Sequence, residues 1–133
     1  LDSTESHNYS NIEDREPCWI HPEAARGLGV KTGDIVRVSS RRGSVLAGVL
    51  VTDRVRPDTV VVRHGAWYDP EEPGEEGSLD VHGCDNVLTI DIPSSRLSNG
   101  NVANSAQVRI ERWTKDLPRV RVWEQPEIVR EDD

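Results

Sequence analysis

Apolar residues occur along the chain in short runs separated by Gly, Pro and charged residues, a pattern typical of a small β domain. Runs or alternation predict strands over residues 16–20, 35–38, 44–52, 60–63 and 106–111. In the 44–52 strand both faces are apolar, which indicates burial on both sides. Residues 21–27 predict a helix of one or two turns, because Pro lies at its first position and Gly at its end.

The succession of these elements predicts the fold class. Five or six short strands, tight turns and one or two short helices indicate a mainly β domain, closed into a small barrel. Residues 1–14 are polar and without period, so they predict an arm or linker, whereas 15–112 form the domain and 113–133 an irregular tail. The tail's tryptophans, Trp113 and Trp123, are expected to pack on the domain or on a partner.

Three polar segments adjoin predicted strands and are the candidate binding positions. His64–Pro70 comes directly after the run Val60–Val62, Asn86–Thr89 returns to apolar character further on, and Asn101–Ser105 precedes the last strand. A loop as long as 66–85 is usually functional or covers a neighbour. Amide and small side chains at three strand ends suit a flat, hydrogen-bonding ligand better than a plain core.

Composition limits the possible functions. The chain has 133 residues, enough for one domain, and only 35% of them are apolar, with no Met or Phe. The apolar content is low for a free-standing enzyme and fits a small β domain that packs against another protein surface. The net charge of −8 argues against nucleic-acid binding. Residues 26–63 hold eight basic and three acidic side chains, which leaves open an anion-facing side or a mixed solvated surface.

No apolar run approaches the length of a membrane span, and no signal peptide or initiator Met begins the chain. We therefore expect a mature or excised fragment with no direct membrane insertion. The two cysteines, Cys18 and Cys84, make no disulfide framework, and a single bridge is possible but unsupported.

Candidate reactive groups give no complete site. His82 and Cys84, with Asp80, Asp69 and His64 nearby, resemble part of a metal site, but zinc takes four ligands and no recognisable spacing supplies the rest. Ordinary hydrogen bonds within the loop are the favoured interpretation. No serine lies in a nucleophile context and Cys84 has no recognisable base, so no catalytic constellation is expected.

Two alternatives remain for the candidate binding positions. Trp67 and Tyr68 are equally well explained as core aromatics at the mouth of the barrel. Asn86 and Asn104 can instead satisfy backbone groups of the loops in which they lie.

Five segments occur in an order that matches a known family. They are Gly33-Asp34-Ile35-Val36, Val51-Thr52-Asp53-Arg54, Gly65-Ala66-Trp67-Tyr68-Asp69-Pro70, Asn86-Val87-Leu88-Thr89 and Gly100-Asn101. From Arg15 to Glu111 the chain resembles the C-terminal cofactor-binding domain of the dimethyl sulfoxide reductase family, whose members are molybdenum or tungsten oxidoreductases. Within that family it is most similar to dimethyl sulfoxide, trimethylamine N-oxide and biotin sulfoxide reductases.

The resemblance implies a double-psi β-barrel that binds molybdopterin guanine dinucleotide in its bis form, with Mo or W held by a different domain. It therefore implies neither a metal ligand nor a catalytic residue in this chain. The cofactor-binding positions that it implies are His64, Gly65, Ala66 and Tyr68 along a pterin, with hydrogen bonds from Asn86, Asn104 and Ser105. His64 departs from the acidic or amide residue that relatives often carry there.

The implied activity is reduction of S-oxides or N-oxides by oxygen-atom transfer in a larger enzyme. There this domain would position and tune the pterins and be inactive alone. Its partners would be the remaining domains of that enzyme and a small S-oxide or N-oxide substrate, with no nucleic acid. The resemblance favours the bacterial periplasm over the cytoplasm. The alternative is a free-standing small barrel that serves as a binding or interaction subunit.

Overall fold

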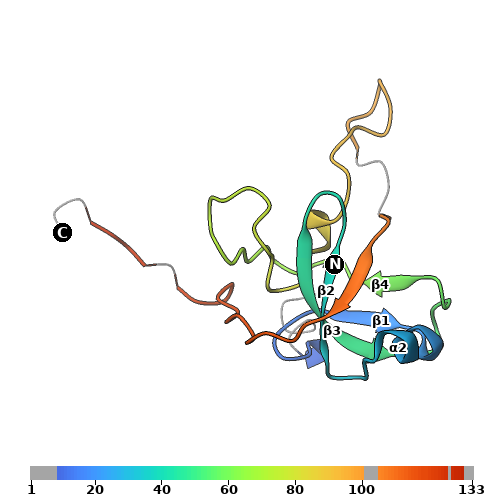
Figure 1. Cartoon of the computed structure of the whole chain (residues 1–133). Coiled ribbons are helices and arrows are strands. Elements are labelled where there is room, and N and C mark those ends of the chain that lie inside the picture. The colour runs from blue at the N-terminus through green and yellow to red at the C-terminus, as the bar shows by residue number, and fades with distance from the viewer. Residues whose placement is uncertain (1–8, 101–104, 126, 131–133) are drawn as a thin grey trace.

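The computed structural model of the protein describes residues 9–100, 105–125 and 127–130 (Figure 1). The named elements are β1 (Pro17–Ile20), α2 (Pro22–Leu28), β2 (Ile35–Ser39), β3 (Ser44–Val51), β4 (Val60–Val62), the 3₁₀ turn η1 (Asp85–Val87) and β5 (Arg109–Arg112). The prediction of a mainly β domain is confirmed, and each predicted strand has its counterpart within a few residues.

The strands form one sheet in the order β4-β1-β3-β2-β5. β1 runs parallel to β3, with Cys18 opposite Val49, and the remaining neighbours are antiparallel. β4 and β5 are the edges, and no pairing joins them within the described ranges. The predicted closed barrel is therefore not confirmed. With three and four residues, these edge strands are too short to complete a ring by themselves.

β3 lies at the centre of the sheet and is buried on both faces, as its sequence predicts. On one face its valines pack in a cluster of buried residues: Cys18, Ile20, Ala25, Val30, Val36, Val38, Val45, Ala47, Val49 and Leu88. On the other face Leu46 packs with Ile35 and Val81, and with Trp113 and Val120 of the C-terminal tail. The tail thus covers the second face of the sheet, which gives a polar chain a core on both sides.

The helix α2 has ends that its sequence explains. Pro22 begins α2, and the Nδ1 of His21 accepts a hydrogen bond from the backbone N–H of Glu23. The helix ends at Leu28, one residue beyond the predicted range. Gly29 is the residue that takes the left-handed conformation past the end, with φ of 69°, rather than Gly27.

Candidate functional site

The segment that follows β4 is exposed. Gly65 has φ of 124°, a conformation that a residue with a Cβ adopts at a cost, and it turns the chain outward. The side chains of Trp67 and Tyr68 are 58% and 52% exposed. The alternative that they are core aromatics is therefore wrong. Together with His64 and the half-buried Ala66, they form a surface to which a flat ligand has access.

The structure brings two of the three predicted binding segments together. The Nδ1 of His64 lies 3.1 Å from both carboxylate oxygens of Asp85, the first residue of η1. Asn86 follows directly, and its exposed side-chain amide makes no hydrogen bond to any described residue. This contact therefore holds the exposed amide of Asn86 close to His64 and Gly65.

The third predicted segment is only partly described. Asn104 lies outside the described residues. Ser105 is exposed on the chain that leads into β5, and no hydrogen bond joins it to the two segments at His64 and Asn86 within the described part of the molecule.

Asp80 holds both ends of the long loop. Its side chain is fully buried, and one carboxylate oxygen accepts a hydrogen bond from the backbone N–H of Asp69 at 2.8 Å. The other oxygen accepts the N–H groups of Gly83 and Cys84, each at 2.7 Å. Burial raises the pKa of Asp80, while these three N–H groups and His82 act in the opposite direction. The carboxyl group is part of the internal structure of the loop, because its oxygens already have partners.

His82 lies beneath the exposed surface. Its buried ring donates a hydrogen bond from Nδ1 to the backbone carbonyl of Trp67 at 2.9 Å. Its edge meets the ring of Trp123 with the centroids 5.6 Å apart, and Nε2 has no hydrogen-bonding partner among the described residues. His82 therefore fixes the backbone of Trp67 from inside the molecule.

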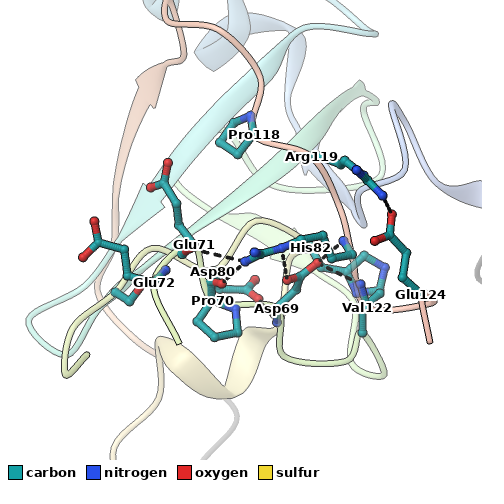
Figure 2. Close-up of polar contacts among 12 residues, drawn as sticks. Asp69, Pro70, Glu71, Glu72, Asp80, His82, Pro118, Arg119, Val122 and Glu124 are labelled. Carbon is teal, nitrogen blue, oxygen red and sulfur yellow. Dashed lines mark hydrogen bonds and ion pairs between the residues drawn. The ribbon is translucent and has the colours of Figure 1, made fainter. Parts of the chain in front are cut away.

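Asp69 joins the same loop to the C-terminal tail. Its Oδ2 accepts the backbone N–H groups of Arg121 at 2.6 Å and Val122 at 3.0 Å. The Arg121 guanidinium donates in return to the carbonyls of Pro70 at 2.9 Å and Glu71 at 3.3 Å (Figure 2). The sequence did not indicate this role, because Asp69 lies in an acidic loop, and a run of acidic residues usually indicates a solvent-exposed segment.

The metal-site hypothesis finds no support in these contacts. Asp69 and Asp80 bind backbone N–H groups, and His82 binds a carbonyl. Within the described ranges, no three His, Cys, Asp or Glu side chains gather in a group that suits a metal ion. Cys18 and Cys84 are free, buried thiols, and burial raises the pKa of Cys18 to about 12 and also raises that of Cys84.

An open groove of about 540 Å³ lies elsewhere, between the start of β2 and the segment after β5. It is lined by Glu13, Gly33, Asp34, Ile35, Arg112, Trp113, Thr114, Lys115 and Leu117. None of the predicted binding residues belongs to it, so the exposed surface at residues 64–68 and Asn86 remains the candidate site.

A family model described as the molydopterin dinucleotide binding domain matches residues 1–107. The match spans both segments that the His64–Asp85 hydrogen bond brings together. The chain belongs to this family. The resemblance inferred from the five sequence segments is thereby confirmed.

Relatives with high identity carry reductase names. The trimethylamine-N-oxide reductase of Haemophilus influenzae is 49% identical over 119 residues, which are 89% of this chain and 14% of that protein. The trimethylamine-N-oxide reductase 1 of Escherichia coli K12 is 42% identical over 109 residues, 82% of this chain and 13% of the relative. The dimethyl sulfoxide/trimethylamine N-oxide reductase of Cereibacter sphaeroides is 36% identical over 126 residues, 95% of this chain and 15% of the relative. The chain thus spans about one seventh of the length of these proteins.

Across the described residues, helices are too short and too polar to cross a membrane.

Proposed function

We propose that this chain is the C-terminal cofactor-binding domain of a larger molybdenum or tungsten oxidoreductase that reduces S-oxides or N-oxides by oxygen-atom transfer. The family match and the reductase names of the relatives support the proposal. The cofactor is molybdopterin guanine dinucleotide in the bis form, with the metal ligand in another domain. The double-psi barrel of the family belongs to this proposal and requires pairing that closes the sheet between β4 and β5.

The observation that carries the proposal is the exposed surface made of His64, Gly65, Tyr68 and Asn86. The positive φ of Gly65 and its missing Cβ let a planar ring approach the backbone. The phenol of Tyr68 and the amide of Asn86 are exposed, and their donors and acceptors match the amide-like edge of a pterin. The residues present therefore fit the cofactor.

The bound cofactor would supply the redox chemistry, and this chain would supply shape and hydrogen bonds. Asn86 offers one donor group and one acceptor to the pterin edge. His64 turns its Nδ1 to Asp85, so that its Nε2 is left for a contact with the cofactor. Ala66, Asn104 and Ser105 belong to the same proposed set.

The proposed partners are the remaining domains of the enzyme and a small S-oxide or N-oxide substrate. Exposed apolar side chains on the loop after η1 support contact with those domains, because such contact would remove their apolar surface from water. They are Ile90, Ile92 and Leu97. We propose the bacterial periplasm, ahead of the cytoplasm, as the compartment.

Cofactor retention in the complete enzyme tests the proposal. Asn86→Ala removes hydrogen bonds worth about 1–3 kcal/mol to a bound pterin, so we expect cofactor loss during timed dialysis to be roughly 5- to 150-fold faster. Asn99→Ala, in the exposed loop before residue 100, is the matched control and should retain cofactor like the wild type. Pterin and guanine per polypeptide are measured by chromatography after release.

Two results would contradict the proposal. One is a wild-type enzyme that contains no pterin dinucleotide. The other is a native polypeptide near 14.9 kDa on an immunoblot raised against this domain, because the relatives are about seven times longer. That second result would favour the free-standing subunit.

A further inference from the structure

The C-terminal tail contacts the loop that carries the exposed surface proposed to bind the cofactor. We call residues Arg121, Val122 and Trp123 the strap. The strap forms neither helix nor strand, and it lies against the loop that carries Asp69 and His82 (Figure 2). It follows residue 107, where the match to the family model ends.

Polar contacts hold the strap to this loop in both directions. The carboxylate of Asp69 is 5% exposed and accepts two consecutive backbone N–H groups from the strap. Such charge-assisted bonds are among the stronger ones in proteins. Arg121 donates back to the carbonyls of Pro70 and Glu71, so the loop and the strap cannot slide past each other without breaking four hydrogen bonds.

Aromatic contacts transmit the position of the strap to the exposed surface. The ring of Trp123 lies 5.1 Å from the ring of Trp67, tilted by 44°. The edge of His82 meets the same Trp123 ring, and His82 also holds the Trp67 carbonyl. Trp67 is therefore fixed through its ring by the strap and through its backbone by His82.

Tyr68 lies between these two fixed residues, Trp67 and Asp69. Its backbone has little freedom, because Asp69 is held by Asp80 through its N–H and by the strap through its side chain. The direction in which Tyr68 points over the surface consequently depends on the strap.

We propose that the strap positions Trp67 and Tyr68 for the cofactor, with Trp123 and Asp69 as the positioning residues. This inference rests on the proposed function and adds residues outside the segment matched by the family model. In this arrangement the strap need not touch the cofactor, and its effect passes through the loop.

The test uses the complete enzyme with Trp123→Ala, Trp123→Phe and Asp69→Asn. The tilted pair with Trp67 is worth about 0.5–1.5 kcal/mol, so Trp123→Ala should speed cofactor loss in dialysis about two- to tenfold. It should also shift the absorption spectrum of the bound cofactor. Trp123→Phe should restore both properties, because a ring is again present. Val129→Ala, an exposed apolar truncation in the same tail, is the control and should change neither.

Asp69→Asn keeps the shape of the side chain and removes its charge. It tests the role of the strap if the Trp123→Ala enzyme does not fold. It should shift the same spectrum and retention in the same direction. The inference is overturned if the folded Trp123→Ala or Asp69→Asn enzyme has a lower melting temperature than the wild type but the same cofactor spectrum and the same cofactor retention. If Asn86→Ala loses cofactor while Trp123→Ala and Asp69→Asn retain it, the strap proposal is overturned and the proposed function stands. A wild-type enzyme without pterin would overturn both proposals.

Discussion

Replacing Asp80 by Asn should open the loop that carries the candidate site. Both oxygens of the buried Asp80 carboxylate accept backbone N–H groups, one from Asp69 and two from Gly83 and Cys84. Asn has one oxygen and one NH₂ group, and the NH₂ group cannot accept a hydrogen bond. In the better of its two orientations the Asn oxygen takes the two N–H groups, and the NH₂ faces the N–H of Asp69.

The size of the effect follows from the one unmatched donor. A buried N–H without a partner costs about 1–3 kcal/mol, so the loop should open roughly 5- to 150-fold more often in Asp80→Asn. Asp80→Ala leaves all three N–H groups unmatched and should cost more.

Amide hydrogen exchange measures this opening in the complete enzyme without requiring two-state unfolding. The amides of Asp69, Gly83 and Cys84 should exchange faster in Asp80→Asn, while those of β3 keep their wild-type rates. Asp91→Asn, an exposed carboxylate on the neighbouring loop, is the matched control and should change none of them. Wild-type protection of Asp69 in Asp80→Asn would refute the reasoning.

Three further predictions concern stability and reactivity. Because burial raises the pKa of Asp80, the protonation-linked part of its contribution to stability is full below its ordinary pKa of about 4 and is lost as pH rises through the raised value, while the hydrogen bonds of the carboxylate remain. The difference in melting temperature between wild type and Asp80→Asn, recorded against pH, should follow that fall, and a flat difference contradicts it. Gly48→Ala would place a Cβ 2.3 Å from the Cβ of Ile12. This overpacking should lower the free energy of unfolding, measured by chemical denaturation, by about 1–3 kcal/mol, and an unchanged denaturation midpoint would contradict the prediction. Cys18 and Cys84 should resist iodoacetamide near pH 8 until the protein unfolds, because burial raises the pKa of both thiols; mass spectrometry of native protein alkylated at either would show otherwise.

The sheet could be predicted because its information is local. Runs of β-branched residues and their alternation mark each strand, and β3 is apolar on both faces in the sequence as in the fold. The start of the last strand was harder to predict. Alternation begins at Ala106, but β5 starts at Arg109, where pairing with Ser39 of β2 begins. The residue at which this strand begins depends on pairing with β2, and the alternation of apolar and polar residues does not indicate where that pairing begins.

The internal contacts of the site could not be predicted in the same way. Asp69, Asp80 and His82 bind backbone N–H and C=O groups, which every residue offers, so no partner residue type marks them in the sequence. His64 was predicted as a candidate because it closely follows the run Val60–Val62, whereas Asn86, which was predicted at a strand end, lies in the 3₁₀ turn η1. The hydrogen bond between His64 and Asp85 was missed, since the two residues are distant in sequence.

Within a short stretch of chain, some residues of the loop are available to a ligand and others hold the loop in place. His64, Gly65 and Tyr68 face outward, while Asp69 beside them and His82 further on are buried and held by backbone contacts. A ligand that binds to side chains already fixed pays less ordering entropy than one that must fix them. Because the contacts that fix them come partly from the strap, a unit cut after β5 would keep every predicted binding residue and lose the partners of Asp69. If the strap positions the site as proposed, the cofactor-binding unit extends to Trp123, beyond the last residue of the family match.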